Sequence, residues 1–145
     1  MTVPPTTRSR LDSAEAARLL ASRGIVPTRQ RVQVAAVLLA RDQHLSAAAL
    51  LERVNREGEP VSKATVYNTL ALFLRKGLVR EVVVDRARVF YDSNTADHHH
   101  LYDTDRCTLT DIDVDQISVS GLPALPEGTV VDNVDVIIRV RRRRS

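Results

Sequence analysis

Three consecutive histidines, His98, His99 and His100, lie in the interior of the chain and begin a stretch, HHHLYD, with the composition of a short strand. Successive side chains of a strand point to opposite faces, so His98 and His100 would share one face and His99 would lie on the other. Two imidazoles at this spacing form a pair of metal ligands that requires one to three further donors. The candidate donors are two nearby acids and one more histidine: Asp92, Asp111 and His44.

A mixed set of nitrogen and oxygen donors suits Fe(II), Mn(II) or Zn(II) and discriminates poorly among them. The alternative for His44 is a surface or helix-capping role. A small metalloenzyme that uses two histidines and a carboxylate for oxygen chemistry is a further alternative, but it would need open coordination positions and a substrate pocket. A short domain in a chain with only 3% aromatic residues offers little of either.

The single cysteine, Cys107, follows the histidines. One cysteine cannot form a disulfide within the chain or supply a CxxC zinc clamp, and this usage fits a reducing cytoplasm. No apolar run approaches the roughly 18 residues that cross a bilayer, and MTVPPTTRSR lacks the apolar segment of a secretory signal. We therefore expect a cytoplasmic protein with no membrane partner.

Charge is distributed unevenly along the chain. Residues 1–92 carry 15 Lys and Arg against 9 Asp and Glu, a net of +6, whereas residues 93–138 carry one arginine against nine acids, a net of −8. Five arginines follow in residues 139–144. A basic first part favours a polyanionic partner, and an acidic, histidine-bearing second part favours cations. An uneven solvated surface is the alternative.

Capping and periodicity predict four helices in the first part of the chain. Residues 1–11, rich in Pro, Thr and Arg, are expected to be disordered. Start and stop signals place helices at 13–23, 28–42, 47–57 and 62–76. Two alternating stretches, 78–84 and 88–92, then form a hairpin. Short helices followed by a hairpin describe a winged helix-turn-helix domain over residues 12–93.

The second part, residues 94–145, is expected to form a small α/β domain for dimerisation and for metal or haem sensing. The pattern predicts strands at 98–103 and 130–140, with 107–112 as a candidate third strand. Prolines and glycines between 121 and 128 leave little room for a long helix. A domain of about 50 residues is below the size at which one core usually suffices, so we expect a homodimer. The fold class is therefore α+β.

The fourth predicted helix carries a polar surface suited to reading double-stranded DNA. Its apolar residues share one face, while four polar residues cluster near its N-terminal end: Lys63, Thr65, Tyr67 and Asn68. A recognition helix inserts such residues into the major groove, where Asn pairs with adenine and Tyr or Thr contacts thymine methyls or phosphates. Arginines in the second helix and the hairpin turn could neutralise phosphates: Arg29, Arg31, Arg86 and Arg88. The alternative is an α-helical domain whose polar face is merely solvated.

The motifs PTRQR, VSKATVYNTL, FYD and HHHLYDTD together resemble the ferric uptake regulator (Fur) superfamily of metal-dependent repressors. The resemblance covers nearly the whole chain after residue 11. It implies a DNA-binding domain, a dimerisation domain and a regulatory metal site, rather than an enzyme. The family's five ligands fall on residues already singled out: His44, Asp92, His98, His100 and Asp111. In the family this site bridges the two domains and fixes the angle between the DNA-binding domains of a dimer.

The chain also departs from the family pattern. The family's structural zinc uses two cysteine pairs. Asp103 and Arg106 stand at the positions of the first pair, with Cys107 one residue out of register, and the second pair is absent. We therefore predict no four-cysteine zinc site. Val26 occupies a position where a basic residue commonly enters the minor groove, and Arg29 is the nearest substitute.

The missing cysteines, the histidine triplet and the sequence LPALPEGTVVDNVDVIIRVRRR resemble the iron-response regulator (Irr) branch of the superfamily. That branch senses iron through haem or the haem-synthesis machinery and controls genes of haem biosynthesis and iron homeostasis. The resemblance implies haem at the cluster His98, His99 and His100, with His99 or His100 as axial ligand. Cys107 is a weaker candidate, because only Arg106 is near enough in sequence to favour its thiolate.

The expected function is therefore a homodimeric, iron- or haem-responsive transcriptional regulator that binds a palindromic, A/T-rich operator. A manganese- or peroxide-sensing repressor of the same family is the alternative. Peroxide sensing would place Fe(II) at the five-residue site and leave an oxidised histidine as the signal. The arginines of residues 139–144 could contact DNA phosphates or keep an edge strand soluble, and we favour the solubility role.

Overall fold

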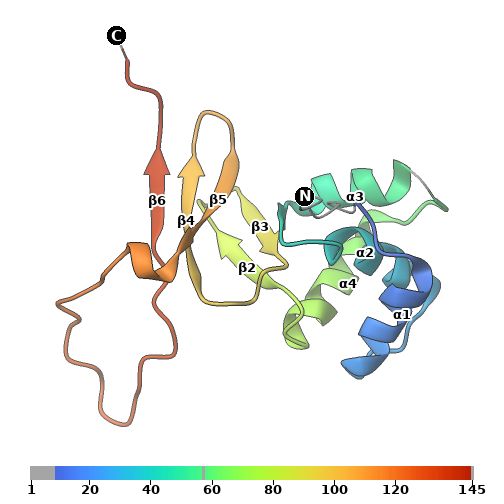
Figure 1. Cartoon of the computed structure of the whole chain (residues 1–145), viewed down its shortest axis with the longest axis horizontal. Helices are drawn as coiled ribbons and strands as arrows, with labels where there is room; N and C mark the ends of the chain where they lie inside the picture. Colours follow the sequence, from blue (N-terminus) through green and yellow to red (C-terminus); the bar gives the residue numbers. More distant parts are fainter. Residues whose placement is uncertain (1–8, 57, 145) are drawn as a thin grey trace, which may run out of the picture. The chain divides into compact units, whose positions relative to one another are not determined.

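The computed structural model describes residues 9–56 and 58–144, and the chain divides into two compact units, Met1–Thr95 and Ala96–Ser145 (Figure 1). Residues 1–8, predicted to be disordered, lie outside the described residues. Leu11, which we assigned to the same segment, donates its backbone N–H to the Ala36 carbonyl at 2.8 Å, so the ordered helical unit includes the end of that segment. None of the helices in the described ranges is long and apolar enough to cross a membrane.

The described part of the first unit contains four helices: α1 (Ser13–Ser22), α2 (Arg29–Leu38), α3 (Ala47–Arg56) and α4 (Lys63–Arg75). Side-chain oxygens of Asp12, Thr28, Ser46 and Ser62 accept hydrogen bonds from backbone N–H groups of the first turns and so fix where the helices begin. Helix α1 begins at Ser13, where the sequence placed its start, and its cap is the preceding residue, Asp12. The apolar faces of the helices meet in one core, whose fully buried members include Leu20, Leu38, Leu50, Leu70 and Phe73.

Helix α2 ends at Leu38 and not at Asp42, where the sequence pattern placed its end. The Gln43 side-chain amide donates to the carbonyls of Val37 and Leu38, at 2.8 and 3.0 Å, and so satisfies the last turn. The chain then enters a two-residue strand, β1 (His44–Leu45), which sequence patterning did not predict. Two residues carry no periodicity, and this strand exists only through its pairing with a distant one.

The predicted hairpin is confirmed as strands β2 (Arg80–Val83) and β3 (Val89–Asp92). Together with β1 they form an antiparallel sheet in the order β1-β3-β2, the wing of a winged helix-turn-helix fold. At the tip the Asp85 carboxylate accepts a hydrogen bond from the Ala87 N–H at 2.8 Å, which holds the turn. The pairing of β1 with β3 sets His44 directly opposite Asp92.

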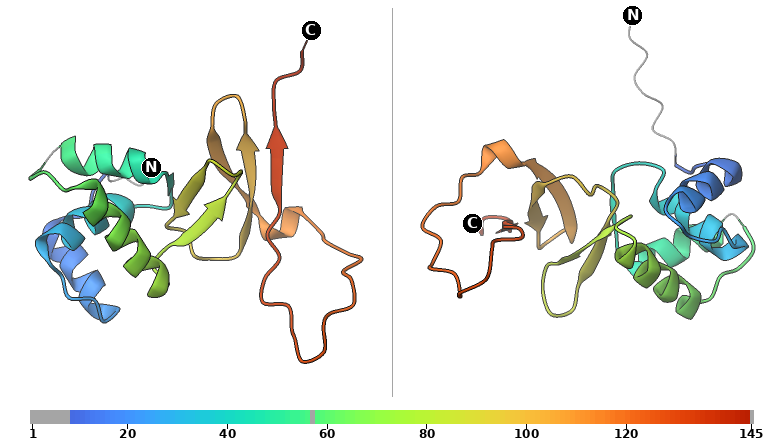
Figure 2. Two further views of the ribbon diagram at one scale, coloured as in Figure 1. Left: turned by 180° about the vertical axis from the view of Figure 1, so that it is seen from behind. Right: turned by 90° about the horizontal axis from the view of Figure 1, so that it is seen from below.

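The second unit is built on a three-stranded sheet in the order β5-β4-β6. Strand β4 (His98–Asp103) pairs antiparallel with β5 (Thr108–Asp113) and parallel with β6 (Ile137–Val140). The described helical content of this unit is the 3-10 turn η1 (Val114–Gln116). The predicted strand 130–140 is too long, because only its last four residues have a partner strand. Residues 117–136 form a wide loop instead (Figures 1 and 2). The mixed helix and sheet class that we predicted is confirmed.

Candidate metal centre and nucleic-acid interface

The first unit holds a histidine–carboxylate pair on its small sheet. Cross-strand partners of an antiparallel ladder place their side chains on the same face, and His44 and Asp92 are such partners. His44 Nε2 lies 3.2 Å from Asp92 Oδ2. The Asp92 side chain is only 1% exposed, and its other oxygen accepts a hydrogen bond from the Asn94 N–H at 2.9 Å. A buried carboxylate held in this way is oriented toward the imidazole.

The second unit holds two histidines and a carboxylate on the sheet formed by β4 and β5. His98 and His100 share a face of β4, as their spacing predicts, and their rings meet edge to face with centroids 4.5 Å apart. Asp111 of β5 is the cross-strand partner of His100. Its Oδ1 lies 3.3 Å from His98 Nε2 and 3.7 Å from His100 Nε2. All three donor atoms therefore converge on one point of this unit.

A local hydrogen bond fixes the tautomer of His98. Its Nδ1 lies 2.6 Å from the Ala96 carbonyl oxygen. A carbonyl only accepts, so Nδ1 carries the proton and Nε2 keeps its lone pair. Histidines that bind metals commonly donate their second ring nitrogen to a carbonyl in this manner, which orients the ring. His98 is therefore prepared to act as a ligand through Nε2.

His99 is held in the opposite tautomer. Its Nδ1 accepts a hydrogen bond from the Val136 backbone N–H at 3.1 Å, so the proton of the neutral ring resides on Nε2. The Val136 carbonyl in turn accepts from the His100 N–H at 3.0 Å. His99, only 5% exposed, thus fastens β4 to the segment that enters β6. This tautomer leaves Nε2 without a lone pair for a metal, which disfavours His99 as the axial haem ligand we expected.

The spacing of the donor atoms within each unit fits a metal ion. Two donors bound about 2.1 Å from one ion lie about 3.0 Å apart in octahedral geometry and about 3.4 Å apart in tetrahedral geometry. The separations of 3.2 Å for His44 and Asp92 and 3.3 Å for His98 and Asp111 fall in this range. Imidazole and carboxylate donors together suit Fe(II), Mn(II) or Zn(II). The residues present therefore fit such an ion.

The turn that follows β4 is closed by a carboxylate. Asp103 Oδ1 accepts hydrogen bonds from the backbone N–H groups of Asp105 and Arg106, both at 3.0 Å. Asp103 and Arg106 are the residues at the positions where the family pattern has its first cysteine pair. Cys107 has its thiol 3.8 Å from the Thr104 carbonyl oxygen. Hydrogen bonds within the turn therefore hold its shape.

Helix α4 divides into a core face and a polar face, as predicted. Val66, Leu70 and Phe73 are buried, whereas Lys63, Tyr67 and Asn68 are exposed and Thr65 is partly exposed. The turn between α3 and α4 is fixed by Asn55, whose side chain donates to the Val61 carbonyl at 3.0 Å and accepts from the Val61 N–H at 2.7 Å. This clamp sets where α4 begins.

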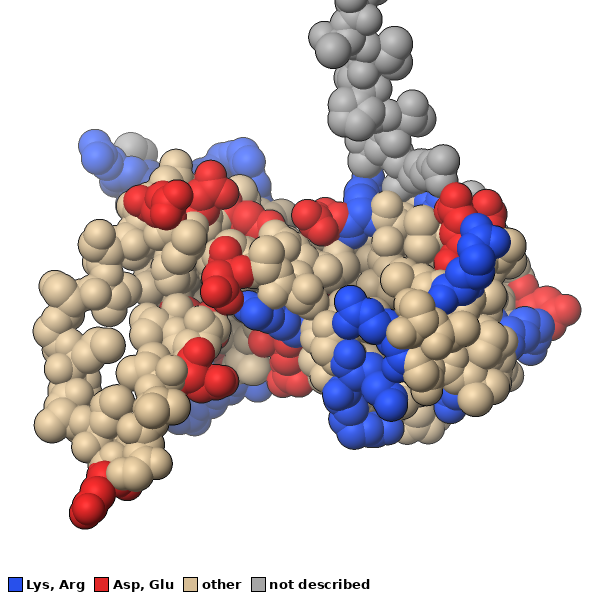
Figure 3. Space-filling model, turned by 60° about the horizontal axis from the view of Figure 1, so that its bottom comes forward, with Lys and Arg blue, Asp and Glu red and all other residues tan. Residues whose placement is uncertain are grey.

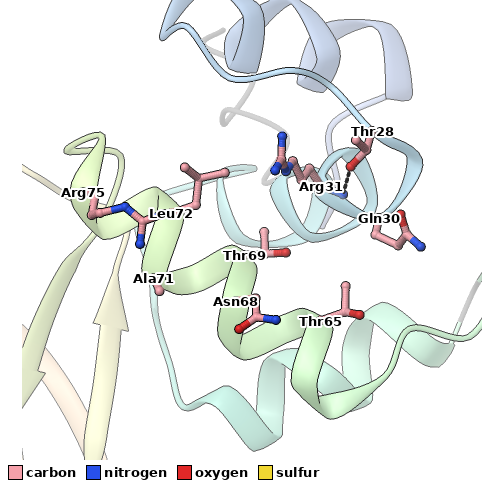
Figure 4. A pocket seen from close by; sticks show the side chains of 9 residues that line it. All are labelled: Thr28, Gln30, Arg31, Thr65, Asn68, Thr69, Ala71, Leu72 and Arg75. Carbon is pink, nitrogen blue, oxygen red and sulfur yellow. Dashed lines mark hydrogen bonds between the residues drawn. The ribbon is translucent and has the colours of Figure 1, made fainter.

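A polar groove of about 490 Å³ lies between the start of α2 and the exposed face of α4 (Figure 4). Among the predicted DNA-binding residues, Arg31, Thr65 and Asn68 line it. Gln30 and Arg75 line the same groove and were missed by sequence reasoning. The signal for Arg75 was present, because it follows Asn68 by seven residues and so returns to the same helix face after two turns.

The predicted phosphate-binding arginines differ in their surroundings. Arg29, the nearest substitute for the basic residue that commonly enters the minor groove, forms an ion pair with Glu59. This pair ties Arg29 to the turn between α3 and α4. Arg31 donates to the Val26 carbonyl at 3.0 Å. Arg86 and Arg88 lie exposed at the tip of the wing. On the face shown in Figure 3, lysines and arginines gather on the helical unit.

The exposed Tyr67, one of the predicted DNA-binding residues, lies near a second tyrosine, Tyr91. Burial raises the pKa of Tyr91, and the neighbouring Glu81 and Tyr67 raise that pKa further. Tyr91 therefore stays an uncharged phenol beside α4. The Lys63 ammonium lies 5.9 Å from the centroid of the Tyr67 ring, within the range of a cation–π contact.

Comparison with known proteins places these features in a family. The model of the ferric uptake regulator family matches residues 22–136. The ferric uptake regulation protein of Synechococcus elongatus is 36% identical over 86 residues, which are 57% of this chain and 58% of that protein. The peroxide-responsive repressor PerR of Staphylococcus aureus is 30% identical over 78 residues, 54% of this chain and 53% of that one. The chain thus spans a little more than half the length of these curated relatives.

Solved structures show the same fold. The ferric uptake regulator of Pseudomonas aeruginosa, determined with manganese, superposes with a TM-score of 0.67. The match covers 89% of this chain and 98% of that chain at 22% sequence identity. Since the family model matches well over half of the residues, the chain belongs to the ferric uptake regulator family.

Proposed function

We propose that this chain is a homodimeric, metal-responsive transcriptional regulator that responds to iron or haem and controls genes of haem biosynthesis and iron homeostasis. Members of the ferric uptake regulator family are transcription regulators and not enzymes, which removes the metalloenzyme alternative. The observation that carries the proposal is the presence, in one chain, of two prepared histidine–carboxylate groups and an exposed α4 face. We expect it to act in the cytoplasm, with no membrane partner.

The regulatory ion would be Fe(II), with Mn(II) and Zn(II) as competitors. We propose that one ion takes its ligands from both units: His44, Asp92, His98, His100 and Asp111. The donor spacings and the tautomer of His98 support each group separately. An ion that binds one arrangement of the two units more tightly than others would shift the population toward it. That shift is the proposed link between metal and DNA binding.

The haem part of the proposal rests on the resemblance to the Irr branch. A cavity of about 280 Å³ in the second unit is lined by His98 and His99 and by apolar side chains that include Val114, Ile117 and Leu122. Its volume is at the low end of ligand pockets, which favours a small ion over a macrocycle as the direct effector. If haem binds, the tautomer of His98 favours it over His99 as the axial ligand. The haem-synthesis machinery is then the proposed protein partner.

The proposed DNA target is a palindromic, A/T-rich operator. Lys63, Thr65, Tyr67 and Asn68 would contact base edges or phosphates, with Arg29, Arg31, Arg86 and Arg88 on the backbone. A palindrome follows from a two-fold dimer that presents two copies of α4. The loop 117–136 supports dimerisation, since it exposes apolar side chains that a second copy could cover: Val119, Leu122, Leu125, Val130 and Val131.

A manganese- or peroxide-sensing repressor is the second candidate. The proposed metal ligands are nitrogen and oxygen donors, and the curated relatives of this chain include a peroxide-responsive repressor. Peroxide sensing would place Fe(II) at the same residues and add one oxygen to a coordinating imidazole. Mass spectrometry after peroxide exposure separates it from the first candidate.

Adjacent histidines supply a matched test of the metal response. Binding to an operator duplex is measured by fluorescence anisotropy with and without Mn(II), for the wild type and for His98→Ala and His99→Ala. We expect His98→Ala to reduce the effect of Mn(II) on operator affinity at least tenfold, because the substitution removes a ligand. His99→Ala removes an equal ring from the same strand and should keep the response. Equal loss in both variants, or a full response in His98→Ala, would contradict the proposed site.

A further inference from the structure

The arginine-rich stretch of residues 139–144 is fastened to the second unit. Its first two residues belong to β6, which pairs with β4. The Val140 carbonyl accepts hydrogen bonds from the Thr104 backbone N–H at 2.9 Å and from the Thr104 hydroxyl at 3.1 Å. Two residues later the Arg142 backbone N–H donates to Asp105 Oδ2 at 2.7 Å. Charges that only kept the chain soluble would need no such fixed backbone.

The side chains of this stretch enclose a groove of about 520 Å³. The residues that line it are Arg139, Val140, Arg141, Arg143 and Arg144. Arg139 belongs to β6, and Arg141, Arg143 and Arg144 follow the end of this strand at Val140. Arg142 is not among the lining residues, although its backbone anchors the stretch.

Three of the four arginines that line this groove carry charges that no carboxylate of the described residues neutralises. Arg141, Arg143 and Arg144 are exposed and form no ion pair with a carboxylate in the described part of the chain. Asp105, the carboxylate tied to this stretch, accepts from a backbone N–H. Guanidinium groups held side by side repel one another, so the arrangement is most stable with an anion that carries several charges. Guanidinium groups match the oxygens of phosphates in particular.

We propose that residues 139–144 form a docking surface for the phosphate backbone of duplex DNA. It would act separately from α4 and supply affinity that does not depend on base sequence. The occupant is argued from charge: a nucleic-acid strand presents a row of phosphates to this cluster of arginines. The inference deepens the proposed function and rests on it. It also replaces the solubility role that the sequence alone favoured for these arginines.

Salt dependence tests this surface. The affinity of the full chain for a short duplex without operator sequence is measured between about 50 and 200 mM salt, where each phosphate contact contributes a slope of about −0.9 in log K against log salt. We expect Arg143→Gln to make the slope shallower by about 0.9 per chain. Arg142→Gln is the matched control, with the same loss of charge at the next residue, and should change the slope by less than half as much.

The outcomes are distinguishable from failure of the proposed function. Equal changes of the salt slope in the two variants would show that only the total charge matters, and would overturn the groove as a docking surface. An unchanged slope in Arg143→Gln would overturn it as well. If Arg143→Gln lost binding to anionic phosphatidylserine vesicles but kept its binding to DNA, the choice of DNA as the occupant would be overturned. An Asn68→Ala variant that loses only operator preference keeps the proposed function valid even if the groove fails. A wild-type chain that binds no duplex would overturn both.

Discussion

Cys107 adopts a left-handed backbone conformation, with φ of 57°, at the end of the turn between β4 and β5. A side chain at Cβ makes this conformation costly, and glycine is the residue that tolerates it. The Cys107 thiol lies 3.8 Å from the Thr104 carbonyl oxygen, which is a weak contact. Cysteine is therefore an unfavourable residue for the backbone conformation at position 107.

We predict that Cys107→Gly stabilises the second unit by about 1 kcal/mol. The measurement is hydrogen exchange of the β4 and β5 amides, which reports the opening free energy of this sheet. Cys107→Ala is the control, because it removes the thiol and keeps the Cβ strain. A gain of equal size in the alanine variant would mean that the thiol, and not the backbone, is responsible.

The three histidines show how far residue-level prediction reaches. Strand parity alone correctly predicts that His98 and His100 share a face. Parity does not predict the tautomers, because these depend on hydrogen-bond partners: the Ala96 carbonyl for His98 and the Val136 N–H for His99. The second of these partners lies 37 residues away along the chain. Residues of one type and one neighbourhood thus acquire different chemistry from the fold.

At the scale of secondary-structure elements, Gln43 joins the His44–Asp92 pair to the helices. Its side-chain amide donates to the last carbonyls of α2, and its amide oxygen accepts from Arg53 of α3 at 3.2 Å. Its backbone N–H donates to the Ser93 hydroxyl at 3.0 Å, next to Asp92. Movement of the ligand pair would therefore disturb α2 and α3, the two helices that Gln43 contacts.

We predict that Gln43→Ala lowers the free energy of unfolding by about 1–2 kcal/mol, because two carbonyls of α2 lose their donor. It should also weaken metal binding about tenfold, since the strand that carries His44 loses its support. Urea denaturation and a Mn(II) titration measure the two effects. Arg53→Ala removes only the exposed bond to Gln43 and should change either quantity far less. If both variants behave alike, the amide's bonds to α2 do not position His44.

Elements with strong local signals were predictable, and those made by pairing were not. Caps and apolar spacing located all four helices, and alternation located β2, β3, β4 and β5. The predicted end of α2 was wrong because the helix is terminated by the Gln43 side chain and not by a local stop signal. Strand β1 was not predicted, and β6 was predicted too long. Both errors have one cause, because the partner strand determines how many residues pair.

At the scale of the whole molecule, the donor groups are split between the two units. His44 and Asp92 belong to the first unit, and His98, His100 and Asp111 to the second. Two arrangements are chemically acceptable. Each group could hold an ion of its own, completed by water, or both groups could share one ion. Only the shared ion couples the two units to each other, because only then does each unit's free energy depend on the other.

We predict one tightly bound Mn(II) per chain, lost when a ligand of either unit is removed. Calorimetric titration of the wild type, His44→Ala and His100→Ala gives the stoichiometry, and melting with and without Mn(II) gives the linked stability. At a metal concentration about 100 times Kd the ion should stabilise the wild type by about 2.7 kcal/mol, and both variants should lose most of this gain. Because the two substitutions act on one ion, the double variant should lose no more than either single variant. Two ions per chain, with His44→Ala leaving one of them bound at full affinity, would show that the units bind metal independently and would remove the proposed coupling.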